Sequence, residues 1–87
     1  MNEADCALIC KALGDETRIS IFNLIKDGEM CACAILERFN FTQPTLSYHM
    51  KILVDCGLVV YKKVGKWRHY IVNNEVYKDF LACFSAK

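Results

Sequence analysis

The chain has 87 residues, 54% of them hydrophobic, with four glycines and one proline, which suits one ordered domain spanning residues 1–87 and excludes a disordered chain. Short apolar runs and an acidic N-terminus predict neither a membrane span nor a signal peptide, so we expect a cytoplasmic protein whose six cysteines are reduced thiols. The net charge of +1 conceals a segregation, because residues 1–41 carry seven acids and four bases whereas residues 42–70 carry five bases and one acid.

The first 28 residues predict two amphipathic helices. Residues 3–13 place Cys6, Cys10 and other apolar side chains at helical spacing. Asp15 can cap a second helix that stops before Gly28. The apolar stripe of this second helix is predicted to be Ile19, Phe22 and Ile25.

A short third helix and a longer fourth helix follow. The third ends at Asn40, and its apolar residues are Ile35, Leu36 and Phe39. Thr42 can cap the fourth helix, and Pro44 is tolerated in its first turn because no amide partner is lost there. The fourth helix runs toward Gly57 with an apolar stripe of Leu46, Met50 and Leu53.

After Gly57 the hydrophobic period changes to about two. The stretches LVVYKK and WRHYIV, separated by Val64-Gly65-Lys66, predict a β-hairpin. Asn73 and Asn74 introduce a last helix with a wide apolar face of Val76, Tyr77, Phe80, Leu81, Cys83 and Phe84. We therefore expect a mainly α fold with a small β-hairpin (α+β), and a partner chain that covers the surplus apolar surface.

Three stretches of the chain, read together, resemble one known family. They are KALGDETRISIFNLI, EMCAC and FTQPTLSYHMKILVDCGLVVYKKVGKWRHY, and they resemble the ArsR/SmtB family of metal-responsive repressors, in particular its arsenite-sensing type. The resemblance implies a winged helix-turn-helix homodimer held by its first and last helices. It also implies binding to double-stranded operator DNA without a cofactor, and release when As(III) or Sb(III) binds cysteine thiolates. Arsenite sensors of the best-known type carry a third cysteine where this sequence has Leu36.

The basic stretch holds the candidate DNA-binding residues. A helix entering the major groove needs polar side chains on its outward N-terminal half. The fourth helix offers Gln43, Thr45, Ser47, Tyr48, His49 and Lys51. We expect Gln43 and His49 to read bases, Thr45 and Ser47 to donate to phosphates or bases, and Tyr48 to lie against the backbone.

The hairpin carries four basic residues and no acid around its turn. They are Lys62, Lys63, Lys66 and Arg68. Such a hairpin suits contact with phosphates or the minor groove, although it also suits an edge strand protected against aggregation. We expect Trp67 and Tyr70 to pack within the core or the hairpin.

The pair Cys31 and Cys33 is the candidate metal site. If residues 30–33 are extended, side chains two apart face the same way, so both thiols can chelate one soft ion. The start of the third helix adds partial positive charge that favours thiolates. The alternative is that both cysteines are small apolar core residues.

The other four cysteines are expected mainly to pack. Cys6, Cys10 and Cys83 lie on the apolar faces of the terminal helices, and Cys56 lies at a helix end. Cys10 or Cys6, meeting Cys31 and Cys33 across a dimer interface, is the first candidate for a third ligand. A small thiol from solution is the second.

Other functions remain open at this point. The same thiols suit a redox-sensing or persulfide-sensing repressor, or a sensor of cadmium or lead. A zinc sensor is less suitable, because residues 74–87 contain no histidine. A thiol oxidoreductase is also less suitable, because the sequence around the two cysteines lacks the alternating strands and helices of a thioredoxin-like fold. Ser47 and His49 lack a carboxylate partner for nucleophilic catalysis, so we expect no enzyme.

Overall fold

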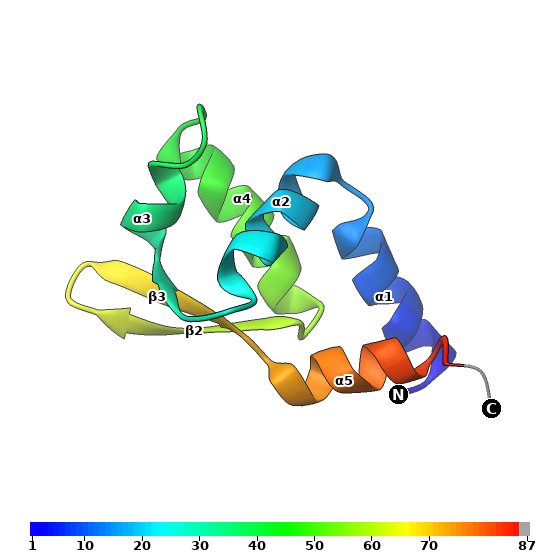
Figure 1. Ribbon diagram of the computed structural model, residues 1–87. Helices are drawn as coiled ribbons and strands as arrows, with labels where there is room; N and C mark the ends of the chain where they lie inside the picture. The colour runs from blue at the N-terminus through cyan, green and yellow to red at the C-terminus, as the bar shows by residue number, and fades with distance from the viewer. Residues whose placement is uncertain (86–87) are drawn as a thin grey trace.

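Five helices and three strands make up residues 1–85, which are the residues that this computed structural model describes (Figure 1). In chain order they are α1 (Glu3–Leu13), α2 (Glu16–Ile25), β1 (Met30–Cys31), α3 (Ala32–Leu36), α4 (Gln43–Asp55), β2 (Val59–Val64), β3 (Trp67–Val72) and α5 (Asn74–Ala82). The prediction of a mainly α fold with a β-hairpin is confirmed.

Side-chain oxygen atoms cap the starts of three of the helices, two of them at residues expected from the sequence. The Asp15 carboxylate accepts from the Arg18 backbone N–H at 3.0 Å, and this bond holds the pKa of Asp15 below its ordinary value. The Asn73 side chain accepts from the Val76 backbone N–H at 3.3 Å. The Asn2 side chain accepts from the Asp5 backbone N–H and so caps α1. Local polar chemistry therefore sets these helix starts.

Three local predictions were wrong. Thr42 precedes α4 but makes no side-chain cap, because its hydroxyl lies 3.2 Å from that of Thr45 instead. Helix α3 ends at Leu36, before Asn40, since the chain continues in tight turns with Phe39 stacked on the ring of Phe41. The third wrong prediction placed Ile19 in the buried apolar stripe of α2.

Helix α2 buries Ile21, Phe22 and Ile25, whereas Ile19 is 45% exposed. Ile21 completes the buried stripe because it lies four residues, about one turn, before Ile25.

The sheet contains a strand that the sequence did not predict. Strands β2 and β3 form the expected hairpin, with Gly65 in its turn at φ +64°, a backbone conformation that favours glycine. The two-residue strand β1 pairs antiparallel with the other edge of β3, which gives the order β1-β3-β2. Met30 pairs with Tyr70 and Cys31 pairs with His69, so the cysteine segment is joined directly to the hairpin.

The core lies beneath α4 and is one contiguous cluster of buried side chains. The predicted stripe of Leu46, Met50 and Leu53 is buried there. Ile35 and Val59 are both 0% exposed, so α3 and the base of the hairpin pack into the same cluster. Burial of this face of α4 turns its polar face toward solvent.

Helix α5 leaves the apolar side chains toward its end uncovered. None of its residues is fully buried, although Val76, Tyr77 and Phe80 pack against the core, where the Tyr77 ring lies edge-on to that of Phe22 with centroids 5.1 Å apart. Leu81 and Phe84 are 49% and 65% exposed, and Leu8 of α1 is 50% exposed. These helices therefore present the surplus apolar surface that the sequence predicted. No helix among residues 1–85 is long and apolar enough to cross a membrane.

Candidate nucleic-acid interface and thiol site

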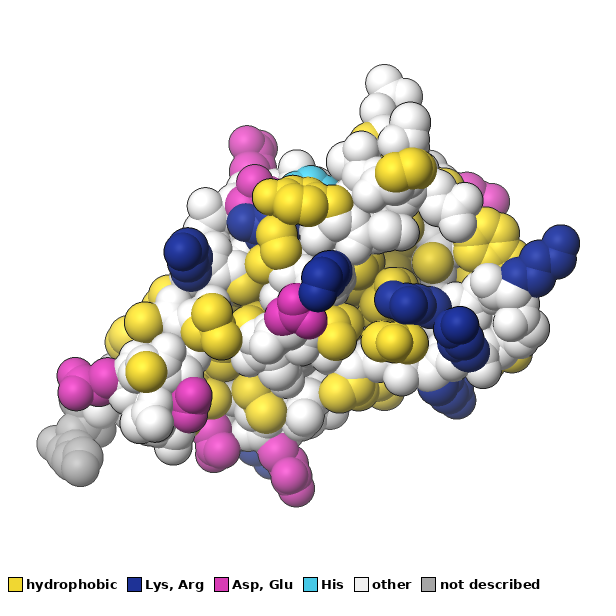
Figure 2. Space-filling view, turned by 180° about the vertical axis from the view of Figure 1, so that it is seen from behind, with side chains coloured by type: hydrophobic (Ala, Val, Ile, Leu, Met, Phe, Trp, Pro, Cys, Tyr) yellow, Lys and Arg dark blue, Asp and Glu magenta, His cyan; other side chains and the backbone are white. Residues whose placement is uncertain are grey.

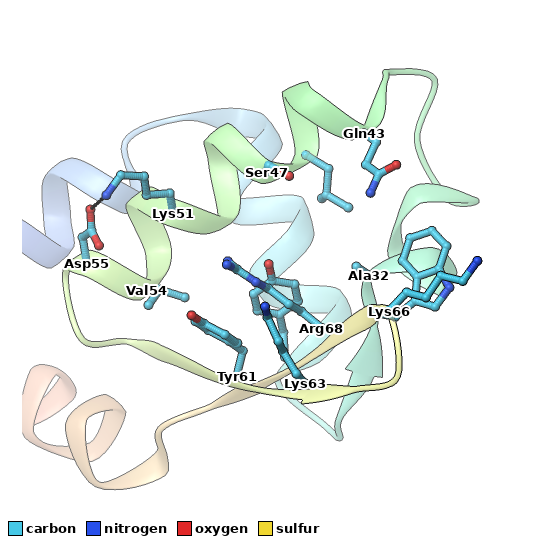
Figure 3. Close-up of a pocket in the computed structure, with 13 residues that line it drawn as sticks. Ala32, Gln43, Ser47, Lys51, Val54, Asp55, Tyr61, Lys63, Lys66 and Arg68 are labelled. Carbon is cyan, nitrogen blue, oxygen red and sulfur yellow. Dashed lines mark hydrogen bonds and ion pairs between the residues drawn. The ribbon is translucent and has the colours of Figure 1, made fainter.

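A groove of about 600 Å³ separates α4 from the hairpin (Figure 3). Both walls carry polar or basic side chains that the sequence had marked as candidate DNA contacts. Those from α4 are Gln43, Ser47 and Lys51, and those from the hairpin are Lys63, Lys66 and Arg68. The fold therefore brings six of the ten candidate DNA-binding residues to one groove.

Strand alternation explains why the bases reach this groove. On one face of the hairpin the cross-strand partners are Val59 with Val72, Tyr61 with Tyr70, and Lys63 with Arg68. The face thus changes from apolar to aromatic to basic between the core and the tip. Lys and Arg side chains gather toward this end of the molecule in Figure 2, and Asp and Glu mostly toward the other end.

Two aromatic residues add to the groove. The guanidinium carbon of Arg68 lies 4.2 Å from the centroid of the Tyr61 ring, a cation–π contact that holds the arginine over the groove. Sequence reasoning missed Tyr61, although the hairpin register would have placed it beside Arg68. Trp67 is half-buried and also lines the groove.

Two of the candidate basic residues, Lys51 and Lys62, form ion pairs with acidic side chains. Lys51 forms an exposed ion pair of 2.8 Å with Asp55, one turn further along α4. Lys62 points to the opposite face of the hairpin, where its ammonium lies 3.3 Å from a carboxylate oxygen of Glu29. The other oxygen of Glu29 lies 2.9 Å from Nδ1 of His69. Lys62 is therefore engaged away from the groove.

Three polar residues of α4 also lie outside the groove lining. Nδ1 of His49 lies 3.1 Å from a guanidinium nitrogen of Arg18, so the His49 ring is held against α2. Thr45 is occupied by its contact with Thr42. Tyr48 is 62% exposed, with its ring 5.2 Å from that of His49. Arg18 is a contact that no sequence pattern indicated.

The two candidate metal-binding cysteines lie where β1 passes into α3. Cys31 ends the strand and caps the helix, and Cys33 is in the first helical turn. The backbone is extended only as far as Cys31, because the helix already begins at Ala32. The side chains nevertheless face each other. The structure pairs their sulfur atoms as a disulfide, with the Cα atoms 5.2 Å apart.

The thiol site and the groove share a wall. Ala32, the residue between the two cysteines, lines the groove opposite Gln43 (Figure 3). Cys31 is also paired with His69 of β3, and Glu29 just before it contacts both strands of the hairpin. Hydrogen bonds to His69 and then Lys62 lower the pKa of Glu29, which keeps its carboxylate charged. A change at the cysteines can therefore reach the groove through adjacent residues.

The other four cysteines lie away from this site. Cys56 donates from its thiol to the carbonyl oxygen of Leu53 at 3.2 Å, and burial raises its pKa. Cys6 and Cys10 line a second groove with Cys83, near the start of α1 and far from α3 (Figure 1). Within residues 1–85, no three His, Cys, Asp or Glu side chains are grouped as a preformed metal site.

Comparisons with known proteins agree with this architecture. Residues 15–61 match the family described as "Bacterial regulatory protein, arsR family". The chain is 43% identical over 81 residues to an arsenical resistance operon repressor of Staphylococcus aureus, covering 93% of this chain and 78% of that protein. It is 47% identical over 75 residues to the repressor of the same description from Staphylococcus xylosus, covering 86% and 72%.

A solved structure shows the same fold. The homodimeric winged helix-turn-helix DNA-binding domain from Mycobacterium bovis superimposes with a TM-score of 0.78 at 26% identity, covering 92% of this chain and 75% of that one. In this fold α4 is the recognition helix and the β2–β3 hairpin is the wing. The family match and the relatives together decide the classification. The chain belongs to the arsR family of winged helix-turn-helix, DNA-binding transcriptional regulators, and is not an enzyme.

Proposed function

We propose that the protein is a homodimeric repressor that binds operator DNA and releases it when As(III) or Sb(III) binds Cys31 and Cys33. The observation that carries the proposal is the wall shared by the thiol site and the groove, formed by Ala32. The arsenical resistance repressors among the relatives support the choice of inducer. The protein would act in the cytoplasm, where thiols stay reduced.

The groove defines how DNA would be bound. The recognition helix α4 would enter the major groove, with Gln43 and Ser47 facing base edges. Lys63, Lys66 and Arg68 of the wing would contact phosphates or the minor groove alongside. No cofactor is needed for these contacts, since the protein itself supplies the positive charge.

A second copy of the chain would complete the binding unit. The exposed apolar side chains of α1 and α5, including Leu8, Leu81 and Phe84, offer the surface through which two copies would associate. Two recognition helices would then read two half-sites of a palindromic operator.

The inducer would act by linkage. A metalloid can release DNA only if it binds the DNA-free conformation more tightly, and DNA must then weaken metalloid binding by the same factor. Binding at Cys31 and Cys33 would reorient the start of α3 and the β1–β3 pairing. Ala32 and the wing would move with them, and the groove would no longer match the duplex.

Two thiolates leave one position of a three-coordinate As(III) to another thiol. In one protomer, Cys6 and Cys10 line the groove on α1, and α1 lies away from α3, at whose start Cys31 lies (Figure 1). The third ligand would therefore come from Cys10 or Cys6 of a second copy, or from a small thiol in solution.

Fluorescence anisotropy tests the proposal. Reduced protein would be titrated onto the duplex upstream of its own gene, with and without arsenite. We expect arsenite to weaken binding by about 5- to 150-fold, the usual range of allosteric coupling. Cys31→Ser should bind the duplex and keep it in arsenite, whereas Cys56→Ser, a matched control outside the site, should respond like the parent. Release from Cys31→Ser by arsenite would refute the site assignment.

The coupling between the thiol site and the wing through Glu29 can be tested separately. Glu29→Gln keeps the size of the side chain but removes the charge that holds His69 and Lys62. We expect this variant to bind DNA and to lose part of its response to arsenite. An unchanged response would assign the coupling to α3 alone.

A second candidate function is a repressor controlled by oxidation of the same cysteines. The pairing of the Cys31 and Cys33 sulfurs as a disulfide favours it. Diamide, a thiol oxidant, would then release DNA without any metalloid, and a phosphine reductant would restore binding. Release by arsenite with the reductant present throughout would favour the metalloid switch instead.

A further inference from the structure

A second groove, of about 520 Å³, opens where the start of α1 meets the end of α5. Its wall includes three of the four cysteines outside the pair at α3, namely Cys6, Cys10 and Cys83, together with Met1 and Phe84. Figure 1 shows these two helix ends beside each other, although they are separated by most of the chain. The groove is thus a thiol-rich site made by tertiary structure.

Helix geometry brings the three thiols to this groove. Cys6 and Cys10 are four residues apart on α1 and so share one face of that helix. Cys83 caps α5, and its thiol lies 3.4 Å from the carbonyl oxygen of Asp79. Cys6 is 9% exposed, whereas Cys10 and Cys83 are exposed. In a single protomer, a ligand can therefore enter from solvent and reach a buried sulfur.

The thiols are close enough to affect one another. The pKa of Cys6 is raised to about 11, first by burial and then by the neighbouring thiols of Cys83 and Cys10. Neighbouring thiolates repel each other, and a cation placed between them reverses this effect. The Cys6 thiol without a ligand is thus held in its protonated form, and a thiophilic cation is the ligand that would offset the repulsion between neighbouring thiolates.

We propose that Cys6 and Cys83 bind a soft d¹⁰ cation of the Cu(I) class in this groove and so join α1 to α5. Two-coordinate binding suits the structure, because Cys6 and Cys83 come from the two helices that meet at this groove, and the d¹⁰ Cu(I) ion accepts two thiolates. Each thiol would release one proton to solvent as its sulfur bonds to the ion, and no electron would be transferred. Within one protomer the site is separate from Cys31 and Cys33, although Cys6 is also a candidate third ligand for As(III). The test therefore removes Cys31 and Cys33, so that Cu(I) binding is measured apart from the metalloid response.

The test uses the full chain in a Cys31→Ser/Cys33→Ser background, which removes the other pair of thiols. Reduced, anaerobic protein would be titrated with Cu(I) against the chromophoric competitor bicinchoninate. We expect one Cu(I) per chain to be withdrawn from the competitor, with a rise in thermal midpoint because the ion binds only the folded state. Adding Cys6→Ser or Cys83→Ser should abolish both effects.

Cys56→Ser in the same background is the matched control, since Cys56 lies outside the groove and its thiol donates to Leu53. It should retain the bound Cu(I) and the rise in midpoint. Circular dichroism spectra would verify that each variant is folded before titration. The proposal is overturned if the background protein withdraws no Cu(I), or if folded Cys6→Ser and Cys83→Ser variants still bind it.

Discussion

Arg18 joins α2 to the recognition helix through His49. One guanidinium nitrogen lies 3.1 Å from Nδ1 of His49, and Nε donates to the carbonyl oxygen of Ala12 at 2.6 Å. Arginine only donates hydrogen bonds, so Nδ1 of His49 accepts and its ring proton is assigned to Nε2. A single side chain therefore links α4 to the end of α1.

The contact between Arg18 and His49 should appear as a coupling energy. We expect Arg18→Ala and His49→Ala each to lower the free energy of unfolding, with a coupling of about 1 kcal/mol in a double-mutant cycle, because each removes the same hydrogen bond. Urea denaturation of the four proteins measures it. Strictly additive losses would show that the two side chains do not interact.

The His49→Ala variant also distinguishes two roles that His49 could have in DNA binding. If His49 positions α4, His49→Ala should weaken binding to all duplexes by a similar factor. If His49 reads a base, the loss should be confined to operators that keep that base. Binding to a set of singly substituted operators decides between them, and we expect the uniform loss.

Arg68 should contribute a phosphate contact. We expect Arg68→Ala to reduce the salt dependence of DNA binding by about 0.9 in the slope of log K against log salt, the value for one phosphate contact. Lys78→Ala, which removes an exposed base on α5, should leave the slope unchanged. Arg68→Lys should keep the slope but lose affinity, because lysine cannot stack on Tyr61 in the same way.

Glu29 should make the protein sensitive to acid. Its pKa is lowered from the ordinary 4.5 by His69 and Lys62, so its stabilising contribution is present above pH 4.5 and is lost as the pH falls through the lowered value. Glu29→Gln has no such group to titrate. The stability difference between parent and variant, measured by urea denaturation, should therefore shrink as the pH falls below 4.5. A constant difference across that range would contradict the prediction.

Cys6 should make the protein sensitive to alkali. Its folded-state pKa of about 11 lies above the ordinary 9.0, so its contribution is fully present below pH 9 and is lost as the pH rises toward 11. Cys6→Ala should flatten the decline of stability across this window, measured by thermal unfolding with a reductant present. Parallel curves for parent and variant would show that Cys6 is not perturbed in the folded state.

Burial should decide the effect of two identical substitutions. Ile35 is 0% exposed between the thiol site and α4, so Ile35→Ala should lower the free energy of unfolding by about 2–5 kcal/mol. Ile19 is 45% exposed, so Ile19→Ala should change it by about 0.5 kcal/mol or less. Urea denaturation measures both, and similar losses would contradict the assignment of the core.

Much of the secondary structure follows from local patterns in the chain. The stripe of Leu46, Met50 and Leu53 predicted α4, and the two-residue period around Gly65 predicted the hairpin. These patterns suffice because they depend on neighbours a few residues apart. The cluster of bases in residues 42–70 likewise indicated the groove before its shape was known.

Long-range contacts decided the rest. A two-residue strand has no period, so only pairing with β3, some forty residues later, reveals β1. The contact between Arg18 and His49 and the meeting of Cys6 with Cys83 also join residues far apart in sequence. Such contacts form only when packing of the apolar core brings distant elements together. Local chemistry therefore indicated which residues could act, and the packed chain determined which of them share a site.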